Sequence, residues 1–313
     1  MFINHTPFPG ISFNSIDVQR QLTTTTLVRG RFRLRATKKP GEWELRPDTE
    51  QGDLFSKDIY YDDNLKQPVR YESDFVPFKA NTDLILNGNA YARESTPKTL
   101  WHYGIAVERD ERILLDKILP VIGPRSSLPQ DLIETQSHHP ARRLTHFGYV
   151  PRSTRSRRKK AGTFSQNWLD QDHPFLPHDF KETHYQGAPK DQQTKGYLKG
   201  NDIIRLSHLL PGIEQQYFTL PDYRLYYQYR IDQEENDQAE NIIGIMNLDT
   251  VLIDIESQHP EDWRVYISWR SRTLDVADSL QTEAMMTVPD SHRADTNADT
   301  NVDTNPEESK HGR

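Results

Sequence analysis

The sequence of 313 residues contains no cysteine, which excludes disulfides, thiol nucleophiles and cysteine-ligated zinc or iron–sulfur centres. No stretch approaches the roughly 20 apolar residues that a membrane-spanning helix needs. Residues 1–10 lack the basic start and the long apolar run of a secretory signal peptide. These absences predict a protein that stays in the cytoplasm and has no membrane partner.

Several common catalytic and nucleotide-binding motifs are also missing. The chain has no Gly-x-x-x-x-Gly-Lys loop, no Gly-x-Gly-x-x-Gly and no Gly-x-Ser-x-Gly. Its formal net charge is −7, so no global attraction to nucleic acid is expected. We therefore expect a non-enzymatic protein with no cofactor, no metal and no nucleic-acid partner.

The features that are present mainly indicate β-strands. Fourteen Tyr, twelve Phe and five Trp supply large apolar areas and favour strands. Between residues 27 and 37 the apolar Val28, Phe32 and Leu34 share one strand face, and four arginines share the other. Those arginines are Arg29, Arg31, Arg33 and Arg35, and we interpret them as a solvated or acid-paired face.

Two hairpins are predicted from alternation around polar turns. Asp110-Glu111 separates strands that begin near residues 100 and 112, and the loop 257–262 separates alternating residues 251–255 from 263–269. In the second hairpin, Trp263 and Trp269 are expected to face the core. The arginines that follow them are expected on the opposite face, in cation–π contacts or salt bridges.

Together these segments predict a mainly β fold, in which antiparallel sheets form a sandwich or a partly open barrel with few short helices. Two β-rich halves are expected at residues 1–120 and 162–276, joined by an irregular proline-rich and basic linker at 121–161. Residues 294–305 repeat Ala/Val-Asp-Thr-Asn. The polar tail 277–313 is therefore expected to be disordered.

The linker ends in a basic run, for which three interpretations stay open. The preferred one is a solvated loop, followed by contact with an acidic protein partner. Contact with nucleic acid comes last, because no aromatic residues that could stack on bases are interleaved with the cations. The run consists of Arg152, Arg155, Arg157, Arg158, Lys159 and Lys160.

A second cluster combines carboxylates and imidazoles at residues 170–184. These groups have the chemistry of metal ligands, and the alternative function is a metal-dependent enzyme or toxin. The spacing matches no compact ligand signature, and interspersed prolines indicate turns in which Asp and His act as caps. The cluster consists of Asp170, Asp172, His173, His178, Asp179 and His184.

Residues 162–192 also contain an ordered series of short motifs, with further motifs on both sides. The complete set resembles the bacterial family catalogued as domain of unknown function 2169. One departure is that Ile122-Gly123-Pro124-Arg125 lacks the Trp of the family's Gly-Asp-Arg-x-Trp. The matching motifs are Ser73–Lys79, Thr82-Asp83, Gly88-x-Ala90, Gly162-Thr163-Phe164, Asn167-Trp168, Pro174–Phe180, Ala188–Gln192, Phe218–Pro221, Asp249-Thr250-Val251 and Trp269-Arg270.

The resemblance implies a cytoplasmic adaptor or chaperone of the type VI secretion system. Such a protein stabilises a cognate effector and helps to load it onto the spike (VgrG/PAAR) complex. No catalytic residue is implied. Because prolines fix φ and aromatics anchor irregular segments, we expect the motifs to form a rigid scaffold or a partner-binding surface. The candidate residues are Asp74, Pro77, Lys79, Trp168, Pro174, Pro177, Asp179, Phe180, Ala188, Pro189, Asp191, Gln192, Trp269 and Arg270.

Overall fold

The computed structural model describes residues 2–90, 100–122, 147–210, 213–232, 239–257, 259–274 and 279–287. The motif departure at 123–125, most of the expected linker and the repeats at 294–305 lie outside these residues. In the described part of the chain, no helix is long and apolar enough to cross a membrane.

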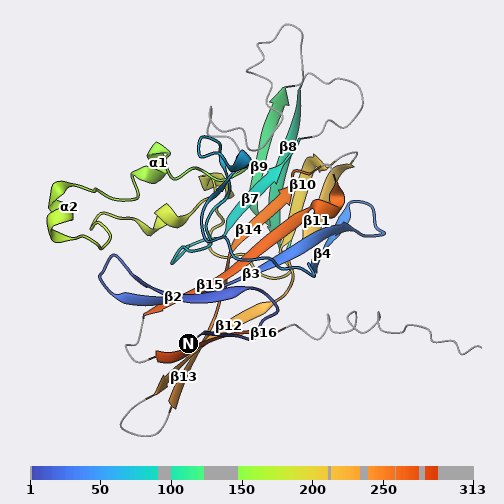
Figure 1. Cartoon of the computed structure of the whole chain (residues 1–313). Coiled ribbons are helices and arrows are strands. Elements are labelled where there is room, and N and C mark those ends of the chain that lie inside the picture. The colour runs from blue at the N-terminus through green and yellow to red at the C-terminus, as the bar shows by residue number, and fades with distance from the viewer. Residues whose placement is uncertain are drawn as a thin grey trace, which may run out of the picture.

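Ten strands form one large curled sheet (Figure 1). Its order is β7-β14-β15-β3-β4-β11-β10-β8-β9, and β2 also pairs with β3. Its neighbours are antiparallel except for the parallel pairs β7–β14 and β4–β11. The strands are β2 (Gly10–Ile16), β3 (Leu22–Ala36), β4 (Glu42–Pro47), β7 (Asp83–Gly88), β8 (Leu100–Arg109), β9 (Arg112–Ile122), β10 (Ile203–Leu210), β11 (Ile213–Thr219), β14 (Asn247–Ile255) and β15 (Arg264–Leu274).

A second sheet of four strands extends from one end of the large sheet (Figure 1). It contains β1 (Phe2–Asn4), β16 (Ser279–Thr287), β12 (Arg224–Asp232) and β13 (Ala239–Ile245) in that order. The small strands β5 (Ile59–Tyr60) and β6 (Val69–Tyr71) pair with each other. The helical segments are α1 (Arg155–Arg158), α2 (Gln166–Gln171) and the 3₁₀ turns Tyr61–Asp63, Glu182–Tyr185, Lys190–Gln192 and Pro260–Asp262.

The predicted mainly β class, with a partly open barrel and few short helices, is confirmed. The sheets are not purely antiparallel, because β1–β16 is parallel as well as the two pairs named above. The two β-rich halves share one sheet: β14 and β15 lie between β7 and β3. Strands of the two halves therefore alternate in the sheet. This order comes from pairing between strands that are distant in sequence, and periodicity does not encode such pairing.

One boundary predicted from composition is wrong, and the expected linker contributes a residue to the core. The tail was expected to be disordered from residue 277, but Ser279–Thr287 form β16, in which Ala284 is fully buried. The expected linker includes Phe147, which is also fully buried and packs in the core. In both places a few apolar residues within a polar stretch pack against partners far away in the sequence.

The main core lies on the apolar face of the large sheet. Val28 and Phe32 of β3 are completely buried. Trp263, directly before β15, and Trp269, within β15, are each 2% exposed. Both orientations agree with the predicted alternation. The Asp110-Glu111 turn is also confirmed: its φ angles of 47° and 63° are those of a type I′ hairpin, whose twist suits the flanking strands.

The opposite face of β3 and β15 is charged and acid-paired, as predicted. The Asp48 carboxylate lies 3.1 Å from Arg31 Nε, 2.9 Å from Arg33 Nε and 2.8 Å from Arg264 Nε. Burial alone would raise the pKa of Asp48. The three guanidinium groups outweigh it, so this pKa lies below the ordinary value of an aspartate.

Asp48→Asn is expected to lower the free energy of unfolding at pH 7 by about 2 kcal/mol, because it removes three ion pairs, of which that with Arg33 is a charge-assisted hydrogen bond. A depressed pKa stabilises the fold above the unfolded-state pKa of about 3.9 and loses this contribution as the pH falls further. The difference between wild type and variant should therefore narrow below about pH 4. Urea denaturation from pH 7 to pH 3 measures the difference in the free energy of unfolding between the two proteins. A difference that widens in acid would contradict a lowered pKa for Asp48.

Candidate functional site

The family motifs at residues 73–79, 249–251 and 269–270 meet in a buried ionic network on the charged face. Arg29 of β3 lies 2.5 Å from Asp74, and its guanidinium stacks 3.9 Å from the centre of the Phe55 ring. Arg270 of β15 lies 2.5 Å from Asp249 and donates a 3.0 Å hydrogen bond to the Asp74 carbonyl. The two arginines therefore hold the loop 73–79 against the sheet.

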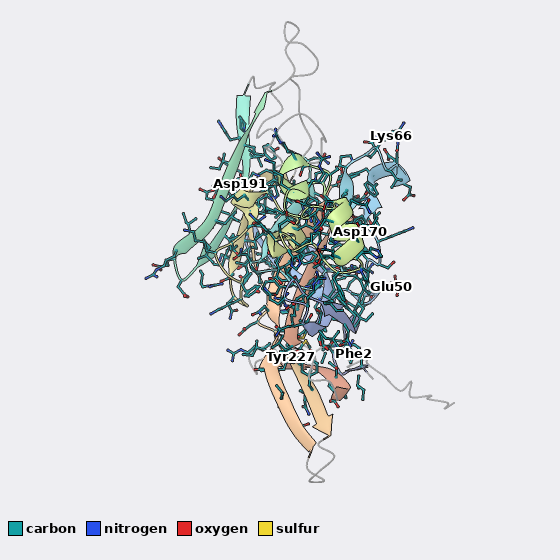
Figure 2. All side chains as sticks on the ribbon, turned by 90° about the vertical axis from the view of Figure 1, so that its left-hand side faces the viewer. Phe2, Glu50, Lys66, Asp170, Asp191 and Tyr227 are labelled. Carbon is teal, nitrogen blue, oxygen red and sulfur yellow. The ribbon has the colours of Figure 1, made fainter. Side chains whose placement is uncertain are left out.

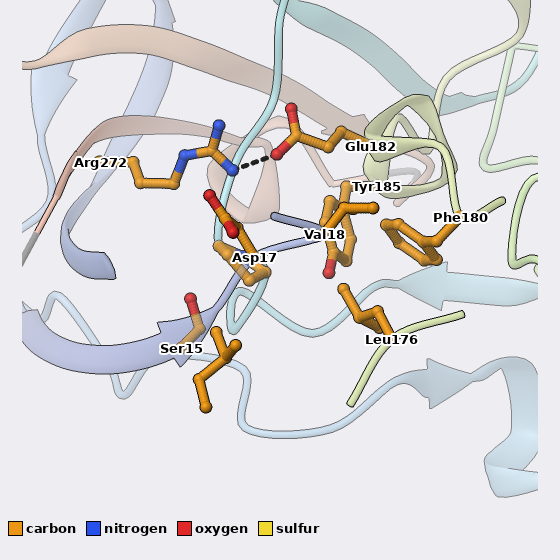
Figure 3. Close-up of a pocket in the computed structure, with 10 residues that line it drawn as sticks. Ser15, Asp17, Val18, Leu176, Phe180, Glu182, Tyr185 and Arg272 are labelled. Atoms are coloured by element: carbon orange, nitrogen blue, oxygen red, sulfur yellow. Dashed lines mark hydrogen bonds and ion pairs between the residues drawn. The ribbon is translucent and has the colours of Figure 1, made fainter. Parts of the chain in front are cut away.

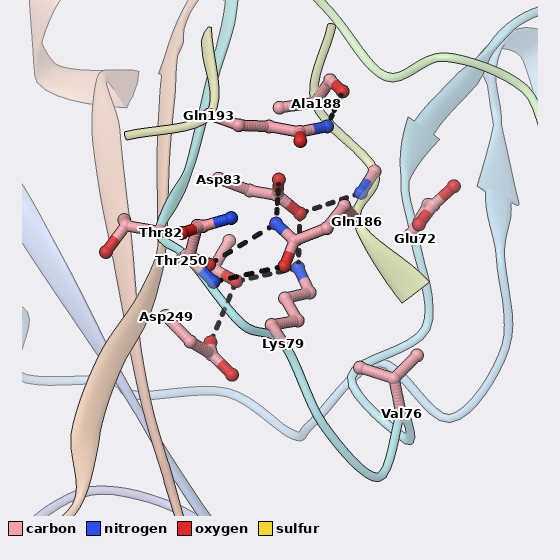
Figure 4. Close-up of polar contacts among 12 residues, drawn as sticks. Glu72, Val76, Lys79, Thr82, Asp83, Gln186, Ala188, Gln193, Asp249 and Thr250 are labelled. Atoms are coloured by element: carbon pink, nitrogen blue, oxygen red, sulfur yellow. Dashed lines mark hydrogen bonds and ion pairs between the residues drawn. The ribbon is translucent and has the colours of Figure 1, made fainter. Parts of the chain in front are cut away.

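The network continues through Lys79 to residues 147–192, which we call the covering segment (Figure 4). Lys79 Nζ lies 2.9 Å from Asp83 and donates to Thr250 Oγ1 at 2.8 Å. Asp83, fully buried at the start of β7, accepts from Gln186 Nε2 and from the Gly187 backbone N–H, both at 2.7 Å. One buried carboxylate thus connects the sheet, the motif lysine and the covering segment.

The motif Ala188–Gln192 fixes the end of the covering segment. Gln192 is fully buried and donates to the carbonyls of Leu84 at 2.7 Å and Phe147 at 2.8 Å. Lys117 of β9 donates to Gln192 Oε1 at 2.7 Å and lies 3.0 Å from Asp191. Burial lowers the pKa of Lys117 despite the adjacent Asp191. These contacts are structural, because both the Nε2 and the Oε1 atoms of Gln192 are hydrogen-bonded within the protein.

The basic run 152–160 is not uniformly solvated, which corrects the preferred interpretation. The Arg157 side chain is 3% exposed and forms a two-pronged ion pair with Glu72. It also donates to the Val150 carbonyl at 2.6 Å and the His184 carbonyl at 3.1 Å. Arg157 therefore anchors the covering segment, whereas its neighbour Arg158 is exposed.

Between these anchors, residues 161–180 form a lobe that projects from the side of the sheet (Figure 1). The lobe is closed at its base by a 2.9 Å backbone hydrogen bond from Lys181 N to the Lys160 carbonyl. In Figure 2 the lobe, marked by Asp170, points toward the viewer. The chain that follows the lobe carries Gln186 and Gly187, which donate to Asp83 of the motif network.

Internal contacts give the lobe a fixed shape. Asp179 accepts hydrogen bonds from Thr163 N at 2.8 Å and Thr163 Oγ1 at 2.7 Å, and these bonds lower its pKa. Ser165 caps α2. Gly162 has φ of 85°, and a Cβ there would lie 2.7 Å from Pro177 Cβ. Glycine is therefore required at the start of the lobe.

The tip of the lobe is built around Trp168, which donates from Nε1 to the Phe175 carbonyl at 3.0 Å. From the β2–β3 turn, Arg20 lies 2.7 Å from Asp172 and 4.5 Å from the centre of the Phe175 ring. Apolar side chains nevertheless face solvent here: Phe164 is 59% exposed, Leu169 52% and Phe175 38%. A fixed lobe with exposed apolar side chains is a candidate partner-binding site.

The carboxylates and imidazoles of residues 170–184 are dispersed over this structure. Asp172 pairs with Arg20 and lies 3.0 Å from His178 Nε2, while Asp179 caps Thr163. His184 Nδ1 lies 3.0 Å from the Arg157 carbonyl, and burial lowers its pKa. Among the described residues no group of three or more His, Asp or Glu could hold a metal ion. Their contacts are those of caps and ion pairs, which agrees with the preferred interpretation of these residues as structural.

A pocket lies between the β2–β3 turn and the C-terminal end of the lobe (Figure 3). Phe180, Leu176 and Tyr185 line one side, and Arg272, paired with Glu182, lines the other. The pocket encloses about 10 Å³, roughly the space of one water molecule and far below the roughly 300–1,000 Å³ of typical small-molecule sites. It is more consistent with a packing defect at the base of the lobe than with a substrate site.

The structure separates the predicted motif residues into two groups. The buried ones belong to the scaffold, and the more accessible ones lie on the lobe, at its neck or in the flanking loops. Sequence reasoning missed Glu72 and Gln186, since an isolated polar residue carries no signal of burial. The buried group is Asp74, Lys79, Pro177, Phe180, Ala188, Pro189, Gln192, Trp269 and Arg270; Pro77 and Trp168 are half-buried, and Pro174, Asp179 and Asp191 are exposed.

Fold and site together define a mainly β protein in which a buried ionic network supports a projecting lobe. A family model described as "Uncharacterized protein conserved in bacteria (DUF2169)" matches residues 19–141 and 126–270. The chain belongs to this family, and the predicted membership is confirmed. Neither the curated proteins nor the solved structures contain a match to the chain.

Proposed function

We propose that this protein is a cytoplasmic, non-enzymatic adaptor or chaperone of the type VI secretion system. It stabilises a cognate effector and helps to load it onto the spike (VgrG/PAAR) complex. The family resemblance motivates the secretion context. The lobe, fixed in shape but apolar at its surface, is the observation that carries the binding function.

The distribution of the motif residues supports this proposal. Asp74, Lys79, Gln192 and Arg270 are each paired with other parts of the chain, so their polar atoms hold the lobe's support together. The exposed apolar side chains Phe164, Leu169 and Phe175 lie on the lobe that this support carries (Figure 1). Rigid presentation of apolar anchors lowers the entropic cost of binding another protein.

The lobe can be tested with the triple variant Phe164→Ser, Leu169→Ser and Phe175→Ser. We expect the recovery of the toxin or spike encoded by neighbouring genes to fall by about tenfold or more, because central apolar anchors carry most binding energy. Recovery is measured by affinity capture of the full-length protein from cells that express those genes.

The matched control is Leu65→Ser, Ile113→Ser and Ile118→Ser, which changes three side chains that are 80%, 64% and 59% exposed outside the lobe. It should recover the partner as wild type does. If wild type recovers neither the toxin nor the spike, and toxin levels are unchanged in a deletion strain, the proposed function is wrong.

A further inference from the structure

Five exposed cations surround the base of the lobe, and we call them the basic neck. Arg155 and Arg158 of α1 share one face with Lys159, its C-cap residue, since positions i, i+3 and i+4 are neighbours on a helix. Lys181 lies beside Lys160 through the hydrogen bond that closes the lobe, and Lys190 follows in the next 3₁₀ turn. All five side chains are exposed.

The basic neck gathers five cations that form no ion pair with a carboxylate in the described part of the chain. Arginines such as Arg29, Arg109 and Arg205 lie within 2.6 Å of a carboxylate. Within the part of the chain that the structure describes, none of the five neck cations has such a partner. Lys160 beneath them has a lowered pKa, first through burial and then through nearby cations that include Lys181 and Lys190. Cations therefore accumulate here on a chain whose net charge is −7.

We propose that the lobe and the basic neck together bind an acidic amphipathic segment of the protein partner. In this segment, Asp and Glu residues flank a cluster of aliphatic side chains. The apolar tip receives the aliphatic cluster, and the neck receives the carboxylates. The inference rests on the proposed adaptor function, because it specifies the chemistry of that partner.

Charge complementarity selects an acidic polypeptide as the occupant. Unpaired exposed cations steer an oppositely charged partner to the surface and suppress cationic ones. A nucleic acid would also be attracted by the neck, but the aromatic rings of the tip already have partners within the protein. The Arg20 guanidinium lies 4.5 Å from the centre of the Phe175 ring, and the half-buried Trp168 ring has those of Phe164 and His173 at 4.9 and 5.4 Å. Exposed Leu169 and Phe164 instead suit aliphatic side chains.

The test is site-specific photo-cross-linking of the full-length protein in cells that contain the neighbouring spike and toxin genes. Arg158 and Phe175 are replaced, one at a time, by p-benzoylphenylalanine, and Arg112 and Leu65 serve as control positions. We expect Arg158 and Phe175 to link to the same polypeptide through a peptide rich in Asp, Glu and aliphatic residues. Mass spectrometry identifies that peptide.

A charge reversal adds a quantitative measurement. Arg155→Glu, Arg158→Glu and Lys159→Glu together should reduce the adduct formed from position 175 by about tenfold. The matched control Arg35→Glu, Arg112→Glu and Arg224→Glu produces the same change in net charge at exposed positions elsewhere and should leave the adduct unchanged.

The inference is overturned if neither position exceeds the controls, if the two positions link to different molecules or to nucleic acid, or if the linked peptide is not acidic. It is also overturned if both charge reversals have equal effects. An acidic amphipathic peptide from a protein other than the spike or toxin would support the inference and contradict the adaptor function. If the neck triple variant captures the toxin as wild type does, the adaptor function is supported and the inference about the basic neck is contradicted.

Discussion

Arg270→Ala is expected to lower the free energy of unfolding by about 3–5 kcal/mol, because it leaves a buried carboxylate without its counter-charge. Asp249 is 1% exposed, and its Oδ2 lies 2.5 Å from Arg270 Nε. The same guanidinium satisfies the carbonyls of Asp74 and Val76. One substitution therefore uncovers a charge and two carbonyl acceptors at the centre of the motif network.

Urea denaturation at pH 7 measures this loss, and Arg112→Ala is the control, since Arg112 is exposed on β9. The control should change stability by no more than about 0.5 kcal/mol. The double variant Asp249→Asn, Arg270→Met should recover part of the loss, because it removes the unpaired charge. A loss below about 1 kcal/mol for Arg270→Ala would show that the pair is not the anchor described here.

Arg157→Ala is expected to cost a similar amount, about 3–5 kcal/mol, and to act on a different part of the structure. Glu72 and Arg157 are 4% and 3% exposed at their side chains. After the substitution the nearest remaining cation for Glu72 is Arg152 at 3.9 Å, which is 37% exposed. The covering segment and the lobe that it carries should therefore detach more readily.

Two measurements follow this effect: the unfolding midpoint in urea and the rate of limited proteolysis within residues 150–185. Arg158→Ala is the control, because it removes the same type of side chain from the same turn at an exposed position. It should leave both quantities near wild type while weakening partner binding. Equal destabilisation by the two substitutions would contradict the difference in burial.

The alternation of apolar and polar residues predicted which face of each strand is buried, because apolar side chains avoid water in every strand alike. Apolar residues at every second position must face the core, which fixed Val28, Phe32, Trp263 and Trp269 without knowledge of the partner strands. The order of the sheet was not predictable. The parallel pairing of β7 with β14 joins residues 83–88 to residues 250–255, and no local signal encodes that choice.

For the candidate site, the motifs indicated which segments matter but not how each residue acts. Trp168, Pro174 and Asp179 were placed in one shaped segment, and they do lie in one lobe. Gln192 and Lys79 were open to either a surface or a scaffold role, and their burial assigns them to the scaffold. An amide or ammonium group suits both roles, so its partners decide between them.

By itself the amino-acid sequence determined the β class, the inward faces of the strands and the membership of a family, because those depend on periodicity and on the order of motifs. The tertiary structure alone decided which charges are buried. Arg157 and Arg158 are identical side chains at adjacent positions, yet the first pairs with Glu72, 85 residues away, and the second faces solvent. A charge can be buried only where a distant chain segment brings its counter-charge, and that depends on how the whole chain packs.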